Sequence, residues 1–281
     1  MPYLKLLRPH QWLKNLMIFF PPFLGGVLLQ PGLAVRGVLP FFSFCLASSA
    51  GYILNDIRDC ENDRQHPEKK GRAIAAGRIS VVAASLLAIL LVFGAGFVGW
   101  QVSLEFFSCL TAYILLTIAY SLFLKQYALI DIFCISAGFL LRLEAGGLAF
   151  DIRLSEWLFL SVFLLSIFLG TGKRFSEKKR LGLAAANHRK ALQDYPEGFL
   201  QGVMYMTGGA VLVTYTMYAI SRHSTLLIYT VPLCCFGLLR YILRIQSGRG
   251  GDPTESLLND FSLFVVGVLW SLMVGWGIYA K

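Results

Sequence analysis

Long apolar stretches separated by short polar ones dominate this chain. Nine of them approach the ~20 residues that an α-helix needs to span the hydrocarbon core of a bilayer. The first is the weakest, because Pro21-Pro22 and Gly25-Gly26 interrupt it. The pattern predicts an all-α polytopic membrane protein with nine transmembrane helices. The expected helices are 16–30, 37–54, 81–100, 104–123, 127–149, 157–172, 199–220, 225–243 and 261–280.

The Lys and Arg residues give this arrangement an orientation. If the N-terminus is cytoplasmic, nine helices place 20 of the 25 Lys and Arg residues on the cytoplasmic side and 4 outside, with Arg142 inside a helix. Cytoplasmic loops of membrane proteins carry such an excess of positive charge. We therefore predict a cytoplasmic N-terminus, an external C-terminus and a location in the cell (inner or plasma) membrane.

Composition limits the class of protein. The 281 residues are 56% hydrophobic, with a mean hydropathy of +0.64, which is too apolar for a soluble domain of this size. The net charge of +9 lies mainly on one membrane face, so it does not indicate a nucleic-acid partner. The six cysteines show no metal-ligand spacing, and no disulfide framework is expected. No linker is visible, so we expect one domain over 1–281.

Two cytoplasmic connections, 55–80 and 173–198, are long, whereas the outer loops are very short. A chain that concentrates its loops on one side is expected to carry its functional site there. The first long loop ends at Ser80, which we predict to be the N-cap of the next membrane helix.

An acidic run with the spacing N-D-x-x-D-x-x-x-D opens the first long loop. Its members are Asn55, Asp56, Asp59 and Asp63. On a continuous helix the three Asp residues fall within roughly 60° of one face. Such carboxylates repel one another unless a cation lies between them, and Mg²⁺ commonly bridges carboxylates to phosphate oxygens. We predict a metal–diphosphate site here, with the alternative that 55–80 is simply a solvated, charged loop.

The second long loop is basic where the first is acidic. Lys173 and Arg174 lie at the membrane exit and could reach into a cavity between helices. Arg is the preferred bidentate phosphate partner, and Lys is a mobile point charge. The alternative, ordinary positive charge on the cytoplasmic side, is favoured for the later cations 178–180 and 189–190.

Other polar residues near the membrane are candidates for the same site. Lys14 faces either the membrane surface or a cavity, and Lys125 is the only basic residue of its short connection. Arg142 and Glu144 lie deep in an apolar segment, where charges are costly and are functional by default. Their partners cannot be placed from the sequence.

The helix plan and these motifs resemble the UbiA-type intramembrane prenyltransferase superfamily, and most closely its branch that transfers phosphoribose to decaprenyl phosphate. The match covers nearly the whole chain. Five stretches carry it: Arg8–Asn15, Tyr52–Asp56, Asp63–Pro67, Arg72–Gly77 and Gly172–Glu177.

The resemblance implies a helical bundle with a central cavity open to the cytoplasm, with Mg²⁺ as cofactor and 5-phosphoribosyl diphosphate as donor. Ordinary prenyltransferases of the superfamily carry a second Asp-rich motif after helix six. This chain has Lys173, Arg174 and Glu177 there instead. The departure favours a donor with additional phosphates over a prenyl diphosphate.

The expected reaction is attack of a polyprenyl-phosphate oxygen on the anomeric carbon of the donor, with loss of diphosphate. The nucleophile is already an anion, so no general base is required. Asp56, Asp59 and Asp63 are the predicted catalytic residues, and with Asn55 they are the predicted metal ligands. The predicted phosphate-binding residues are Lys14, Arg58, Arg72, Lys125, Lys173, Arg174 and Tyr195.

Two alternatives remain open from the sequence. One is prenyl transfer from a prenyl diphosphate to a small aromatic or alcohol acceptor. The other is a transporter or channel, which would favour polar residues at mid-membrane in several helices rather than at the inner face. The sequence does not determine the length of the lipid or whether the protein is a homo-oligomer.

Overall fold

The computed structural model describes residues 2–65, 69–181 and 190–280, and these parts of the chain form helices and connections without a β-strand. The all-α fold class is therefore confirmed. The long helices are α4 (Val38–Arg58), α6 (Val81–Trp100), α7 (Leu104–Leu122), α8 (Ile130–Phe150), α9 (Glu156–Leu181), α11 (Phe199–Ser221), α13 (Val231–Gln246) and α15 (Phe261–Tyr279).

Shorter helical pieces connect them. The N-terminal part comprises α1 (Pro2–Leu7), the 3₁₀ helix η1 (Pro9–Phe19), α2 (Phe20–Leu24) and α3 (Leu33–Arg36). The first long connection holds α5 (Cys60–Gln65) and η2 (Lys69–Gly71), and η3 (Leu124–Gln126) follows α7. The remaining pieces are η5 (Lys190–Leu192), α12 (Thr225–Ile228) and α14 (Pro253–Asn259).

The prediction of nine spanning helices is not confirmed. In the described residues, eight helices are long and apolar enough to cross a membrane, and they cover the eight later segments of the prediction. The first predicted segment, 16–30, is divided between the end of η1, the five residues of α2 and a turn that begins at Gly25. Its prolines and glycines interrupt the helix, since proline lacks the backbone N–H that an α-helix interior requires.

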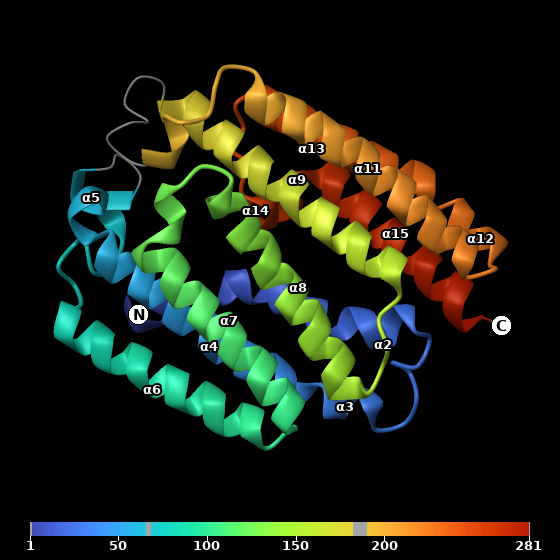
Figure 1. Ribbon diagram of the computed structural model, residues 1–281, viewed down its shortest axis with the longest axis horizontal. Helices are drawn as coiled ribbons and strands as arrows, with labels where there is room; N and C mark the ends of the chain where they lie inside the picture. Colours follow the sequence, from blue (N-terminus) through green and yellow to red (C-terminus); the bar gives the residue numbers. More distant parts are fainter. Residues whose placement is uncertain (1, 66–68, 182–189, 281) are drawn as a thin grey trace.

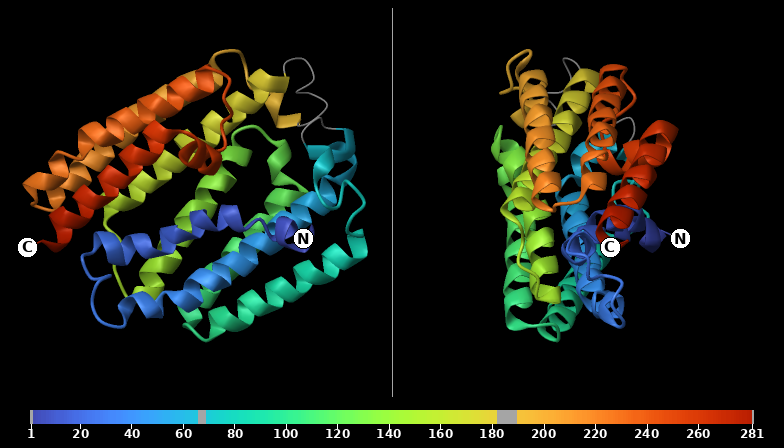
Figure 2. Two further views of the ribbon diagram at one scale, coloured as in Figure 1. Left: turned by 180° about the vertical axis from the view of Figure 1, so that it is seen from behind. Right: turned by 90° about the vertical axis from the view of Figure 1, so that its right-hand side faces the viewer.

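The long helices run side by side along the molecule (Figure 1). Helix α5 lies at one end, and α12 and the C-terminus lie at the other. Helix α9 packs against α11, and α4 packs against α6. The segment η1–α2 crosses the bundle and contacts α4, α8 and α14, as the view from behind in Figure 2 shows.

Local sequence signals fix several helix starts. The Ser80 hydroxyl accepts a hydrogen bond from the backbone N–H of Ala83, which confirms the predicted N-cap of α6. Ser103 caps α7 in the same way, and Asp260 caps α15. These side chains satisfy backbone donors that would otherwise have no partner in the first turn.

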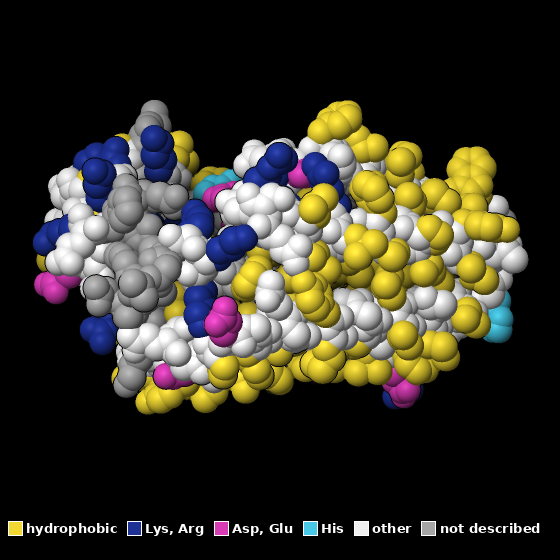
Figure 3. Space-filling model, turned by 90° about the horizontal axis from the view of Figure 1, so that it is seen from above, with side chains coloured by type: hydrophobic (Ala, Val, Ile, Leu, Met, Phe, Trp, Pro, Cys, Tyr) yellow, Lys and Arg dark blue, Asp and Glu magenta, His cyan; other side chains and the backbone are white. Residues whose placement is uncertain are grey.

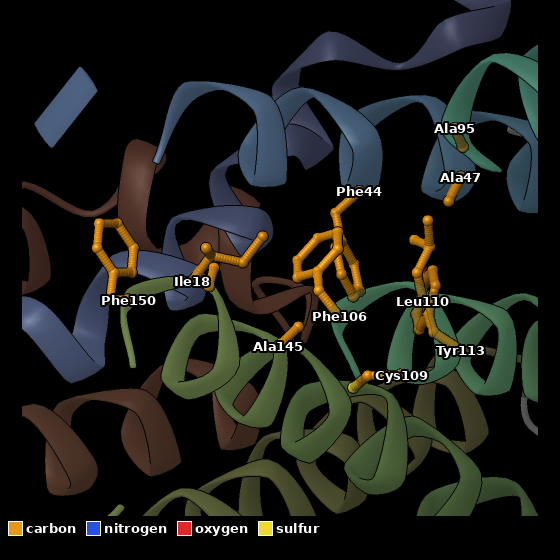
Figure 4. Packing of buried hydrophobic residues seen from close by; sticks show 11 residues of the cluster. Ile18, Phe44, Ala47, Ala95, Phe106, Cys109, Leu110, Tyr113, Ala145 and Phe150 are labelled. Carbon is orange, nitrogen blue, oxygen red and sulfur yellow. The ribbon is translucent and has the colours of Figure 1, made fainter. Parts of the chain in front are cut away.

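One hydrophobic cluster holds η1, α4, α7 and α8 together (Figure 4). Phe44 and Phe106 are fully buried in it, with ring centroids 5.9 Å apart. The approach of η1 to α8 requires Gly146, because a Cβ atom there would lie 2.3 Å from the carbonyl oxygen of Ile18. This contact fixes the N-terminal segment against the bundle, so that Lys14 and Asn15 of η1 point into the protein.

The structure provides the partners of Arg142. Its guanidinium donates to Asn15 Oδ1 at 2.8 Å, to the carbonyl of Gly138 at 2.7 Å and to the Tyr113 hydroxyl at 2.6 Å. Arg142 is 6% exposed, so these bonds replace the solvation that it loses. It links α8 to η1 and α7, which is a structural role. Glu144, by contrast, is exposed on α8.

Candidate active site

The acidic run lies at the junction of two helices. Helix α4 ends at Arg58, Asp59 is its C-cap with φ −92° and ψ 4°, and α5 begins at Cys60. The carboxylates therefore do not occupy one face of a continuous helix, which corrects that expectation. The break occurs at Asp59, and it places Asp56 and Asp63 on different helices.

Asp56 and Asp63 nevertheless converge. The Nη1 atom of Arg72 lies 3.0 Å from Asp56 Oδ1 and 2.6 Å from Asp63 Oδ2. Arg8 binds the same oxygen of Asp56 at 2.5 Å, and its guanidinium also lies over the ring of Tyr52. Both carboxylates are about 4% exposed. Two oxygens from two helices thus meet at a single cationic atom.

Asn55 and Asp59 form a second pair. The ammonium of Lys125 lies 3.0 Å from Asn55 Oδ1 and 2.5 Å from Asp59 Oδ1. The Asn55 amide also donates to Asp59 Oδ2 at 3.0 Å. Lys125 is buried in η3, so the connection between α7 and α8 is tied directly to the acidic run.

The donor set suits a hard divalent cation that also binds a substrate. In the described residues, no three His, Cys, Asp or Glu side chains come together as a metal site; the carboxylates act in pairs. Mg²⁺ commonly binds through one or two carboxylates and completes its shell with water and substrate phosphates. Burial raises the pKa of Asp63, and the positive charge of the nearby Arg72 opposes this shift. The Asp63 carboxylate therefore needs a nearby positive charge to stay ionised. The paired oxygens therefore fit Mg²⁺ together with a phosphorylated ligand.

A second cluster surrounds Lys173. Its ammonium lies 3.0 Å from Asp252 Oδ2, at the start of α14. Burial alone would raise the pKa of Asp252, but Lys173 and Lys14 outweigh it and hold that pKa well below its usual range. Lys14 is surrounded by protein, and burial lowers its pKa, while the charge of Asp252 opposes that shift. Lys14 and Lys173 thus share one electrostatic environment.

Arg174 lies in a third, buried cluster. Its guanidinium binds Asp131 at 2.5 Å, Glu177 at 3.0 Å and the Tyr120 hydroxyl at 2.9 Å, and it is 2% exposed. The Tyr195 hydroxyl donates to the other oxygen of Asp131 at 2.7 Å. Arg174 and Tyr195, which we predicted to bind phosphate, have their polar atoms bound to protein groups in the interior, so a direct phosphate contact by either stays a prediction.

The two long loops approach each other at the same end of the molecule. Lys69 of the first loop lies 3.8 Å from Glu177 of the second. Lys178 donates to the carbonyl of Tyr195, which holds the far part of the second loop against α9. Figure 3 shows Lys and Arg side chains gathered at one end of the molecule, whereas the remaining surface in that view is largely hydrophobic.

The structure therefore divides the predicted site residues into groups. Asn55, Asp56, Asp59, Asp63, Arg72 and Lys125 come together as the acidic site. Lys14 and Lys173 both act on Asp252, and Arg174 and Tyr195 are internal. Arg58 is exposed at the last residue of α4.

Sequence reasoning missed three residues of these clusters. Arg8 precedes Pro9 in a stretch that we assigned to the family resemblance alone. Asp252 follows two glycines and precedes Pro253, which is a helix N-cap signal. Asp131 is an acid within an otherwise apolar segment, and an acid in such a segment usually has a charged partner or a functional role.

Comparison with known proteins identifies the family. Residues 19–268 match the UbiA prenyltransferase family. Curated relatives named decaprenyl-phosphate phosphoribosyltransferase include one from Mycolicibacterium smegmatis, 35% identical over 98% of this chain and 92% of its own length. Those from Corynebacterium glutamicum and Mycobacterium tuberculosis are 34% and 32% identical, over 98% and 96% of this chain and 86% and 92% of their own lengths.

Solved structures show the same fold. A UbiA homologue from Archaeoglobus fulgidus bound to GPP and Mg²⁺ has a TM-score of 0.78 at 20% identity, with both chains covered completely. The same homologue bound to Cd²⁺ has a TM-score of 0.74, also at 20% identity, over 99% of this chain and 98% of its own. With the family model matched over most of its length, the chain belongs to the UbiA prenyltransferase family.

Proposed function

We propose that this protein transfers 5-phosphoribose from 5-phosphoribosyl diphosphate to a polyprenyl phosphate such as decaprenyl phosphate, with release of diphosphate and with Mg²⁺ as cofactor. The observation that carries the proposal is the convergence of Asp56 and Asp63, beside a cluster of cations, at the end of the bundle that holds both long loops. The names of the relatives support the choice of substrates.

Asp56 and Asp63 would hold the metal ion, with Asn55 and Asp59 as further oxygen ligands beside it. A bound Mg²⁺ neutralises the charge that develops on the departing diphosphate. Arg72 and Lys125 now neutralise the same carboxylates. With Mg²⁺ bound, Arg72, Lys125 and Arg8 would be available to the diphosphate.

Lys14 and Lys173 are the proposed partners of the remaining phosphate of the donor, the 5-phosphate. Lys173 lies in the second loop, where other UbiA enzymes are expected to carry carboxylates, and a cation binds a phosphate without a second metal ion. Arg174 would act indirectly, since its bonds to Asp131 and Glu177 fix the segment of α9 that carries Lys173.

The reaction follows from these charges. An oxygen of the polyprenyl phosphate forms a bond to the anomeric carbon, and the bond between that carbon and the diphosphate oxygen breaks, with its electron pair leaving on diphosphate. The acceptor is already ionised at neutral pH, so the site requires no general base. The protein contributes by positioning both anions and by stabilising the leaving group.

The long apolar helices make the chain a multi-pass membrane protein. We propose that it lies in the cell membrane with its N-terminus and both long loops in the cytoplasm, an arrangement in which the segment η1–α2 crosses the membrane as well. The donor is water-soluble and the acceptor is a lipid, so the reaction belongs at this membrane surface.

A prenyl transfer to an aromatic or alcohol acceptor is the alternative activity. It would be favoured by a second carboxylate motif able to hold another Mg²⁺. Glu177, the acid of the second loop nearest to Lys173, has one oxygen bound to Arg174. The residues of this region therefore favour a donor that carries additional phosphates.

A transfer assay tests the proposal. Purified protein is incubated with Mg²⁺, polyprenyl phosphate and 5-phosphoribosyl diphosphate labelled in the ribose, and the lipid fraction is scored for label. We expect a labelled lipid in the presence of Mg²⁺ and none with a chelator or with the Asp56→Asn variant. No lipid label, together with consumption of a prenyl diphosphate and an aromatic acceptor, would favour the alternative.

A further inference from the structure

The connection between α13 and α14 is held tightly against α9. The hydroxyl of Tyr241 donates to the carbonyl oxygen of Gly251 at 2.8 Å. A Cβ atom on Gly251 would lie 2.6 Å from Ser176 Cβ and 2.8 Å from the carbonyl oxygen of Gly172. Only glycine allows this approach, and its result is to bring the next residue, Asp252, to Lys173.

The two carboxylate oxygens of Asp252 have different partners. Oδ1 accepts hydrogen bonds from the backbone N–H groups of Thr254 at 3.1 Å and Glu255 at 3.3 Å. Oδ2 lies 3.0 Å from the ammonium of Lys173. The first oxygen fixes the side chain at the start of α14, so the second is held in place for the lysine.

Lys14 reaches the same region from η1. Burial lowers the pKa of Lys14, and Asp252 provides the largest opposing effect, followed by a smaller one from Glu255. The positive charges of Arg142 and Arg8 add to the lowering. A buried lysine with too little counter-charge loses its proton and then no longer attracts an anion.

From this geometry we infer that Asp252 is a positioning residue, which orients the ammonium of Lys173. Lys14 approaches from η1, which packs against α14, so that the two lysines form one subsite for a phosphate monoester. The inference rests on the proposed function and deepens it, because a phosphate monoester is the chemical group that separates 5-phosphoribosyl diphosphate from a prenyl diphosphate.

The test is the KM for 5-phosphoribosyl diphosphate of the Asp252→Asn variant. We expect the KM to rise about tenfold, because the ammonium of Lys173 loses the charged partner that orients it. The kcat should change less than the KM. Asp252→Glu should restore most of the wild-type KM, and Glu197→Gln, at an exposed acid outside the cluster, should match wild type. An unchanged KM, or a fall in kcat as large as the rise in KM, would overturn the inference.

A second measurement does not depend on turnover or on the variant folding. Wild-type protein is treated with an amine-acylating reagent with and without ribose 5-phosphate, and the modified lysines are quantified by mass spectrometry. We expect ribose 5-phosphate to protect Lys14 and Lys173 but not the exposed Lys70. Protection with no transfer activity would refute the proposed reaction while retaining the subsite, and transfer activity without protection would refute the subsite alone.

Discussion

Asp56 and Asp63 belong to different helices, α4 and α5, yet their carboxylate oxygens meet at one nitrogen of Arg72, at 3.0 and 2.6 Å. Two nearly buried anions in such proximity require a cation between them. A bound Mg²⁺ would supply this positive charge, and Arg72 would then be available to the diphosphate.

The first prediction concerns these two carboxylates. Asp56→Asn and Asp63→Asn should each lower kcat by at least about 100-fold, because each removes an oxygen ligand from the site that stabilises the leaving group. Steady-state transfer assays at several Mg²⁺ concentrations measure this. Glu61→Gln, an exposed acid on the same helix as Asp63, is the matched control and should retain full activity. Full activity of Asp56→Asn at limiting Mg²⁺ would refute the metal assignment.

The second prediction separates the two roles of Arg72. Arg72→Ala leaves Asp56 and Asp63 without their shared cation, so it should lower the free energy of unfolding by about 1–3 kcal/mol in metal-free buffer. Thermal unfolding monitored with and without Mg²⁺ checks this. Mg²⁺ should raise the Tm of the variant more than that of wild type, since the ion replaces the missing charge. Equal Mg²⁺ effects on both proteins would show that the ion binds elsewhere.

The third prediction follows from the burial of Arg174. Arg174→Ala removes the guanidinium partner of the buried Asp131 and should cost about 3–5 kcal/mol of stability, as for other broken buried ion pairs. The yield of folded protein and its Tm should fall together. Arg58→Ala, at an exposed position, should leave both unchanged. A stable Arg174→Ala protein with only a raised donor KM would restore the original expectation of direct phosphate binding.

The fourth prediction concerns orientation in the membrane. Single cysteines at Lys70 in η2 and at Ser221 at the end of α11 are exposed and belong to opposite ends of the bundle. A membrane-impermeant maleimide applied to intact cells should label Ser221→Cys, and it should label Lys70→Cys only after permeabilisation. The wild-type chain gives the background from its native cysteines. The reverse pattern would place the acidic site outside the cell.

The sequence predicted the helices well where an apolar run of spanning length was uninterrupted. Helix α6 agrees with its predicted bounds of 81 and 100, and Ser80 caps it as expected. The segment 16–30 was the exception, since its prolines and glycines shorten the helices that it forms. Helix α9 extends past the predicted end at residue 172 because the pair Arg174 and Glu177 continues the helix with favourable spacing.

The sequence predicted the acidic residues of the site, but it did not predict which cation pairs with which carboxylate. The spacing of the acidic run identified the right residues, but it did not show that Arg72 serves Asp56 and Asp63 while Lys125 serves Asp59. Such pairings join residues up to 66 positions apart and depend on how the helices pack. Asp252 lies 79 positions from Lys173, and no local pattern joins them.

The most direct test of the account uses two differently labelled samples of 5-phosphoribosyl diphosphate with purified protein, Mg²⁺ and polyprenyl phosphate. One donor carries ³²P in the 5-phosphate and the other in the terminal phosphate of the diphosphate. The account predicts that the first label enters the lipid and that the second is released as diphosphate in equal amount. Retention of both labels in the unreacted donor, with a prenyl diphosphate consumed by the same preparation, would contradict it.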